Sequence, residues 1–279
     1  MTAQQLNHNN IMTKYTKTIG ALAATTMLMG GYATAQLEGE VSVGYTNMYE
    51  FRFIDFGQDL INGGADVAYS FADGWAINGG AWYGSTNDLS GTLGNLNELD
   101  VYAGVSKEFG PVTVELGYIF YHFPDVVAAD TQEIYAKVSA ELGAGFGVGV
   151  TGYLDIQRLN GYYIQPEVTW STEFSECLSL EMALGCALAD GMGSANGSSV
   201  SVGQLSREAL VGGGNPGGTV DGFQGWYVSA SLPWKAMENL TITPFVKYTD
   251  GASDLLTNLT DITGGQDYLI GGVSLGVSF

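Results

Sequence analysis

Acidic side chains recur at alternate positions of apolar segments, and they are the residues in this sequence with most capacity for chemistry. Seven of them share one side of their segments with three bases: Asp66, Asp100, Glu115, Glu133, Asp155, Glu167 and Glu181, with Arg52, Lys137 and Lys247. Charges that line a low-dielectric interior concentrate ions of opposite sign. We therefore predict that these ten residues line a channel favouring cations or neutral solutes.

The same residues allow a second interpretation, which the sequence leaves open. The acids can pair with the few bases and with Tyr and Thr hydroxyls and so fill the interior. Small inward residues such as Gly104 and Gly117 favour space for water instead. Arg52 has two corresponding roles, as a constriction that orients carboxylate-bearing solutes or as a structural ion-pair partner.

The sequence contains few residue patterns of the kinds that catalyse hydrolysis or bind metals. Beyond residue 35 the chain has one histidine, His122, in the stretch YHFPD. Hydrolytic chemistry usually needs a histidine beside Ser or Asp, and a zinc site needs about four clustered ligands. Cys177 and Cys186 are nine positions apart in one alternating segment, too far for a disulfide in a continuous strand. We expect no catalytic residue, no metal site and no cofactor.

Composition excludes one partner class. The chain has a formal charge of −20 with only 9 Lys and Arg. Phosphate binding needs clustered cations, so nucleic acid is not a partner.

Hydrophobic alternation with a period of two predicts the elements that position these residues. We expect twelve strands, at residues 38–50, 61–71, 74–84, 97–109, 111–122, 132–142, 145–156, 161–174, 176–189, 223–234, 239–250 and 267–279. Turns after the even-numbered segments are short, whereas links after the odd-numbered ones are longer, beginning with FRFIDFGQDL at 51–60. This asymmetry predicts an all-β, antiparallel up-and-down transmembrane barrel with short periplasmic turns and long extracellular loops. The longest loop, about 190–222, is either a surface loop or folds inward.

Aromatic residues at the segment ends share the apolar side of their strands. Beside the short turns they are Phe71, Trp75, Phe109, Phe146, Phe174, Trp234 and Phe279, which predicts an aromatic girdle at the membrane interface. A second set near the long links is Tyr49, Tyr83, Phe120, Tyr162, Trp226 and Tyr248. The last strand alternates strictly and ends on an aromatic residue, as in strands that the barrel-assembly machinery reads. It must pair with the first strand to close the barrel.

The first 35 residues predict a cleaved signal peptide. Lys14 and Lys17 precede a short apolar stretch at 19–32, and Ala33-Thr34-Ala35 is a small-x-small cleavage site. Met12 is an alternative start. Residues 36–279 then form the barrel.

One region resembles a known family. GYTNMYEFR at 44–52 with Ile54 and Gly57, DVYAG at 100–104, GYIFY at 117–121 with Pro124, and EIY at 133–135 are similar to the Gcw-type family of conserved hypothetical outer-membrane proteins. The resemblance covers roughly residues 38–140 and implies a barrel of unassigned function. Phe53 stands where the family has glycine.

Together these patterns predict a porin-like passive channel for small cationic or neutral solutes in the bacterial outer membrane. Its expected partners are outer-membrane lipid, the assembly machinery and the solutes. One alternative is a non-conducting structural, receptor or adhesin-type barrel that acts through its extracellular loops. A third is an outer-membrane lipid-modifying enzyme, although we expect no enzymatic activity.

Overall fold

Twelve long strands make up nearly all of the described chain. In the computed structural model the described residues are 36–87, 96–124, 130–158, 160–192, 220–251 and 267–279. The strands are β1 (Gln36–Phe51), β2 (Ile54–Phe71), β3 (Trp75–Asn87), β4 (Asn97–Phe109), β5 (Val112–His122), β6 (Thr131–Gly143), β7 (Phe146–Asp155), β8 (Tyr162–Ser175), β9 (Leu178–Met192), β10 (Val220–Ser231), β12 (Leu240–Gly251) and β13 (Asp267–Ser278). A two-residue strand, β11 (Trp234–Lys235), lies in the link between β10 and β12, and a 3-10 turn, η1 (Ala72–Gly74), joins β2 to β3. Within these ranges no helix has the length and apolar character needed to cross a bilayer.

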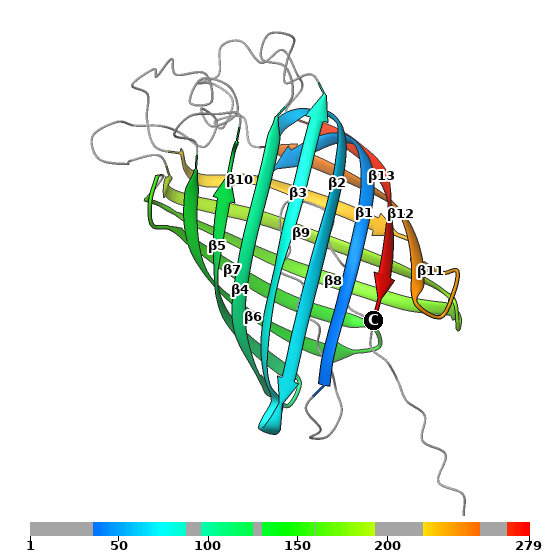
Figure 1. Cartoon of the computed structure of the whole chain (residues 1–279). Helices are drawn as coiled ribbons and strands as arrows, with labels where there is room; N and C mark the ends of the chain where they lie inside the picture. Colours follow the sequence, from blue (N-terminus) through cyan, green and yellow to red (C-terminus); the bar gives the residue numbers. More distant parts are fainter. Residues whose placement is uncertain (1–35, 88–95, 125–129, 159, 193–219, 252–266) are drawn as a thin grey trace, which may run out of the picture.

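The strands form a closed antiparallel barrel, as the sequence predicts. Each long strand pairs with its neighbours in chain order, and β13 pairs with both β12 and β1 (Figure 1). At this seam the backbone N–H of Phe279 donates to the carbonyl of Gly39, and that of Gly39 donates to the carbonyl of Phe279. Closure removes the unpaired edges that an open sheet would leave.

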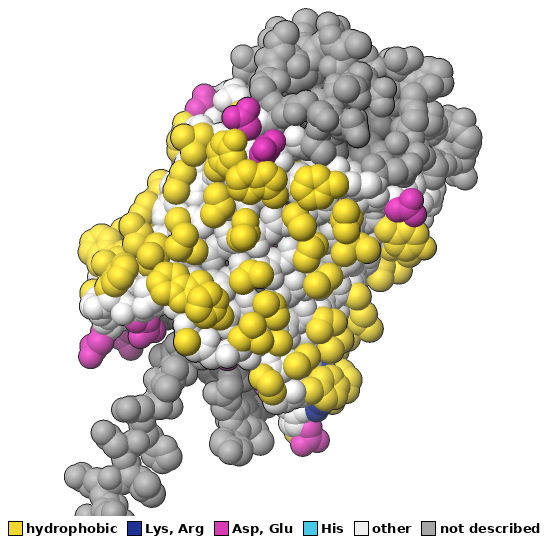
Figure 2. Space-filling model, turned by 180° about the vertical axis from the view of Figure 1, so that it is seen from behind, with side chains coloured by type: hydrophobic (Ala, Val, Ile, Leu, Met, Phe, Trp, Pro, Cys, Tyr) yellow, Lys and Arg dark blue, Asp and Glu magenta, His cyan; other side chains and the backbone are white. Residues whose placement is uncertain are grey.

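The two faces of the wall differ as the alternation predicts. On β13, Leu269, Val273 and Leu275 are exposed on the outside, whereas Tyr268 and Ile270 are buried inside. Figure 2 shows hydrophobic side chains spread over the outer wall, with acidic side chains near its margins. An apolar exterior around a more polar interior is the reverse of a soluble protein and suits a barrel in lipid.

The first link differs from the prediction. Residues 51–60 were expected to form a loop, but β1 continues to Phe51 and β2 begins at Ile54, so that only Arg52 and Phe53 form the turn. Both turn residues have positive φ, 53° and 68°, typical of tight hairpin turns. The segment was expected to be one of the longer links, but it extends the hairpin, and its residues Phe53, Phe56 and Leu60 are buried inside the barrel.

Some expectations lie outside the described residues. These include the signal peptide and most of the predicted 190–222 loop, of which residues 190–192 and 220–222 belong to β9 and β10.

Candidate functional site

The tip of the β1–β2 hairpin, residues 49–56, crosses the bore of the barrel; we call this segment the hairpin tip. β1 is flanked by β2 and β13, yet Arg52 contacts side chains on β6, β7 and β8, which lie on the opposite wall in the strand order. In Figure 1 the upper ends of the blue strands β1 and β2 curve across the barrel. The hairpin tip therefore occupies the bore at the end of the barrel that carries the longer links.

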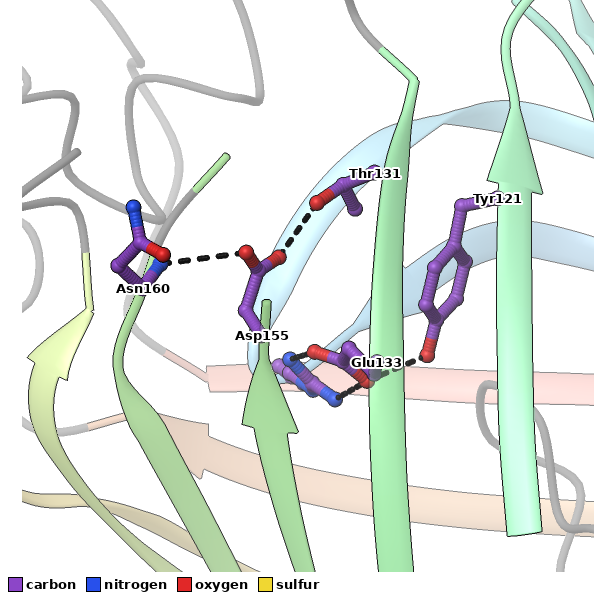
Figure 3. Close-up of polar contacts among 6 residues, drawn as sticks. Tyr121, Thr131, Glu133, Asp155 and Asn160 are labelled. Carbon is purple, nitrogen blue, oxygen red and sulfur yellow. Dashed lines mark hydrogen bonds and ion pairs between the residues drawn. The ribbon is translucent and has the colours of Figure 1, made fainter. Parts of the chain in front are cut away.

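Arg52 anchors the hairpin tip through an ion pair. Its Nη1 and Nη2 atoms donate to Oε1 and Oε2 of Glu133 on β6, each at 2.7 Å. Oε2 also accepts the hydroxyl of Tyr121 on β5 at 2.8 Å (Figure 3). Arg52 is 8% exposed and Glu133 is 1% exposed. Two parallel charge-assisted hydrogen bonds fix both the position and the orientation of the guanidinium.

Aromatic rings complete the surroundings of Arg52. The Cζ atom lies 4.8 Å from the ring centroid of Phe51, 4.9 Å from that of Tyr153 on β7 and 4.4 Å from that of Tyr163 on β8. Such distances are within the range of cation–π attraction. Burial alone would lower the pKa of the Arg52 guanidinium, but Glu133 raises that pKa above its usual range, so that Arg52 remains charged.

A second ion pair holds the other side of the hairpin tip. Lys247 on β12 pairs with Oε2 of Glu50, and both side chains are buried. Oε1 of Glu50 accepts the backbone N–H of Phe53 at 2.5 Å, closing the turn. The Phe53 ring is 2% exposed and lies 6.5 Å from the ring of Tyr227 on β10. Contacts to opposite walls thus hold the hairpin tip inside the bore.

A β-bulge brings Tyr49 inside, which corrects one expectation. The pairing of β1 with β2 shifts between Met48 and Glu50, and this shift reverses the alternation of inward and outward side chains. Tyr49 was expected in the second outward aromatic set, but it is 4% exposed and donates its hydroxyl to Oε2 of Glu98 at 2.8 Å.

All ten predicted lining residues lie on inward positions, but the structure gathers only some of them. Arg52, Glu133 and Lys247 meet around the hairpin tip, with Asp155 beside Glu133 in the register of β7 and β6. Asp66, Asp100, Glu115, Lys137, Glu167 and Glu181 lie on the wall. Three of these carboxylates accept a hydrogen bond from a tyrosine hydroxyl. Tyr135 donates to Glu115, Tyr227 donates to Glu167, and Tyr102 donates to Asp66.

Asp155 has a structural role at the end of β7. Its Oδ1 accepts the backbone N–H groups of Gln157, Arg158 and Asn160, and its Oδ2 accepts the hydroxyl of Thr131. The contacts with Asn160 and Thr131 are drawn in Figure 3. A carboxylate with four donors holds the following link in place.

Rings occupy part of the space that glycine was expected to leave for water. The ring of Tyr135 on β6 lies over Gly117 on β5, where an added Cβ would come within 2.3 Å of it. Tyr135 also belongs to a buried aromatic and aliphatic cluster that includes Tyr49, Phe53 and Phe56 of the hairpin tip. At this level the interior is packed.

Sequence reasoning missed Glu50 and Glu98 as functional residues. Glu50 lies beyond the bulge of β1, where the alternation is reversed, whereas Glu98 shares the inward parity of Asp100 on β4, so that parity alone could have found it. A usable signal was the charge alternation Glu50-Phe51-Arg52, since buried charges need partners.

The remaining candidates lie where the sequence placed them. The seven predicted girdle residues are all exposed, although their contact with a membrane interface stays a prediction. His122 lies at the rim with Nδ1 2.9 Å from Asp130. Cys177 and Cys186 are free thiols. The described residues contain no cluster of three His, Cys, Asp or Glu side chains that could hold a metal ion.

Comparison with known families identifies the chain. The family profile of Gcw_chp, a bacterial protein of unknown function, matches residues 31–176. The chain belongs to the Gcw_chp family. The Gcw_chp match includes the hairpin tip, Glu98, Asp100 and Glu133, so that much of the candidate site lies inside the family region. No curated protein matches the sequence.

Solved structures show the fold of this Gcw_chp protein. An outer membrane channel from Pseudomonas putida F1 is similar with a TM-score of 0.52 and 9% identity, covering 92% of this chain and 100% of that one. The KdgM porin has a TM-score of 0.48 at 11% identity over 86% and 99% of the two chains. The NanC porin has 0.47 at 13% over 86% and 98%. In fold the structure matches bacterial outer-membrane β-barrel proteins, as the sequence predicts.

Proposed function

We propose that the protein is an outer-membrane channel for small cationic or neutral solutes, narrowed by its own hairpin tip. The observation that carries this proposal is the charge imbalance of the interior. Among the described residues the buried acids are Glu50, Glu98, Asp100, Glu115, Glu133, Asp155 and Glu181, whereas the buried bases are Arg52 and Lys247. Both bases are already paired, with Glu133 and Glu50. The negative potential left over favours cations over anions.

Two partners belong to the same proposal. The exposed apolar side chains of the outer wall contact outer-membrane lipid, and the aromatic-ended β13 is the strand that the barrel-assembly machinery reads. Phe279, which directly follows β13, lies against Gly39 of β1, so that recognition and closure involve the same end of the strand.

Planar-bilayer recording under a salt gradient tests the channel. We expect steady conductance with a reversal potential on the cation-selective side. Changing Glu115→Lys and Glu181→Lys together should move the reversal potential toward anions, because both side chains are buried in the bore. Glu173→Lys at the exposed end of β8 is the control and should have a smaller effect. An unchanged reversal potential in the double variant would refute the assignment of these acids to the conducting path.

A non-conducting barrel is the second candidate, and one observation favours it. The hairpin tip and the buried cluster around it fill the bore at one level. A correctly inserted protein that remains silent in the bilayer would support a structural, receptor or adhesin-type role over the channel.

A further inference from the structure

Two acids on β4 lie beside the hairpin tip with too few partners for their charge. Glu98 and Asp100 both point into the bore and are 2% and 0% exposed. Glu98 accepts the hydroxyl of Tyr49. Neither oxygen of the Asp100 carboxylate has a hydrogen-bond donor among the described residues.

No described base neutralises this pair. Glu98 and Asp100 are two residues apart on the same inward face of β4, and the described part of the chain has no ion pair to either. The nearby charge of Arg52 is already taken up by Glu133. Two adjacent buried carboxylates repel one another and lose hydration, so that they require a proton or another cation.

The geometry favours a cation over a single shared proton. A shared proton would satisfy one Asp100 oxygen and leave the other without a donor, whereas a cation can contact both. Aromatic residues also flank Asp100 on both neighbouring strands. Asp100 lies in register with Trp82 on β3 and with Tyr121 on β5. The rings of Trp82 and Tyr49 have centroids 5.7 Å apart, and such π-faces attract cations.

We propose that Glu98 and Asp100 form a binding subsite for a monovalent cation, either an inorganic ion or a primary ammonium group, beside the hairpin tip. The proposal rests on the proposed function and deepens it, because it places a cation at the narrowed level of the bore. Tyr49 belongs to the hairpin tip and bonds to Glu98, so that the subsite is completed only when the hairpin tip is docked.

Ligand-linked stability provides a test that does not depend on conduction. A ligand that binds only the folded state raises its stability as the ligand concentration rises. The full chain, folded in detergent micelles, is unfolded in urea while KCl replaces N-methyl-D-glucamine chloride at constant ionic strength. We expect the midpoint to rise with K⁺ in the wild type and to lose this dependence in Asp100→Asn. Glu173→Gln, which removes a remote charge, should keep the dependence. A second series with methylammonium chloride distinguishes an organic ammonium from an inorganic ion.

Infrared spectroscopy of the wild-type protein provides a second measurement, which stands even if Asp100→Asn fails to fold. With N-methyl-D-glucamine as the only cation, the pair must hold a proton, and we expect a protonated carboxyl band that K⁺ or methylammonium removes. If neither the urea midpoint nor the protonated carboxyl band changes with K⁺ or methylammonium, the proposed subsite is wrong. A protein that shows the cation dependence but no conductance would keep the subsite and refute the channel.

Discussion

At the residue scale, the position of the hairpin tip depends on the ion pair between Arg52 and Glu133. Both side chains are buried, and removing a charge from water is costly. The pair is tolerated because its geometry is bidentate and because Tyr121 and the surrounding rings satisfy the remaining groups. The two side chains together therefore stabilise the fold, whereas either one alone would be a destabilising buried charge.

Breaking the pair on one side should destabilise the protein. We expect Arg52→Ala to lower the free energy of unfolding by about 3–5 kcal/mol, because it leaves Glu133 as an unpaired buried charge. Changing Arg52→Met and Glu133→Leu together should cost much less, since apolar residues of similar size replace both charges. Urea unfolding of the three chains in the same micelles measures the difference. Equal losses in the single and the double variant would contradict this account.

Phe53 has an unfavourable backbone conformation that its ring compensates. Its φ is 68°, in the left-handed region, which a side chain with a Cβ rarely adopts. Phe53→Ala and Phe53→Gly both remove the ring, and each should lower the free energy of unfolding by about 3–5 kcal/mol, as for other buried phenylalanines. Phe53→Gly should nevertheless be more stable than Phe53→Ala by about 1 kcal/mol, because glycine alone adopts positive φ without strain. The reverse order in urea unfolding would mean that backbone strain is unimportant here.

At the element scale, the β1–β2 hairpin is longer than the wall requires. Glu50 pairs with Asp55 and Phe51 with Ile54, so that the ladder continues beyond the bulge and into the bore. Residues on β4, β6, β7, β8, β10 and β12 contact it. An element anchored on so many strands limits the width of the bore.

Shortening this hairpin should widen the path. An Asn-Gly turn in place of Phe51–Ile54 suits a tight hairpin and removes the contacts of Arg52 and Phe53. We expect single-channel conductance to rise several-fold. The paired Arg52→Met and Glu133→Leu variant is the matched control, because it removes charge but retains the hairpin tip, and its conductance should change less. A shortened chain with the conductance of the wild type would exclude the hairpin tip as the constriction.

The sequence alone predicted most of the strands, but it did not predict the hairpin tip, and the reason is physical. The period of two is strong on β5, β7 and β13, where one face is apolar, and these strands lie where they were expected. At Tyr49 the bulge reversed the period, and at 51–60 the apolar residues belong to a hairpin that packs inside rather than to a loop outside. The positions of Glu115 and Lys137 followed from parity, whereas the meeting of Arg52 with Glu133, 81 residues later, depends on how the barrel closes.

At the scale of the whole molecule, the barrel is turned inside out relative to a soluble protein. Large apolar residues such as Leu116 and Val43 are about half exposed, at 56% and 53%. In water this surface would promote association. In a bilayer the same surface is what holds the barrel in place.

Neighbouring residues on β1 test this arrangement. Val43 faces outward and Ser42 faces the bore. Val43→Arg should lower the free energy of unfolding in phospholipid vesicles by about 2–4 kcal/mol, because a charge is then held in the hydrocarbon region. Ser42→Arg adds the same charge to an acidic interior and should cost less. Urea unfolding of the two variants in the same vesicles measures the contrast, and a larger loss for Ser42→Arg would reverse the assigned faces.

The hairpin tip comes from the first two strands, but its anchors come much later in the chain. Glu50 meets Lys247 across 197 residues, and Arg52 meets Glu133 across 81. We expect contacts so distant in sequence to form after the neighbouring strands have paired, because closing a long loop costs entropy that only ordered partners can offset. The newly inserted barrel should therefore pass through a leaky stage before the hairpin tip docks, and a cell that makes this protein rapidly would experience that leak during biogenesis.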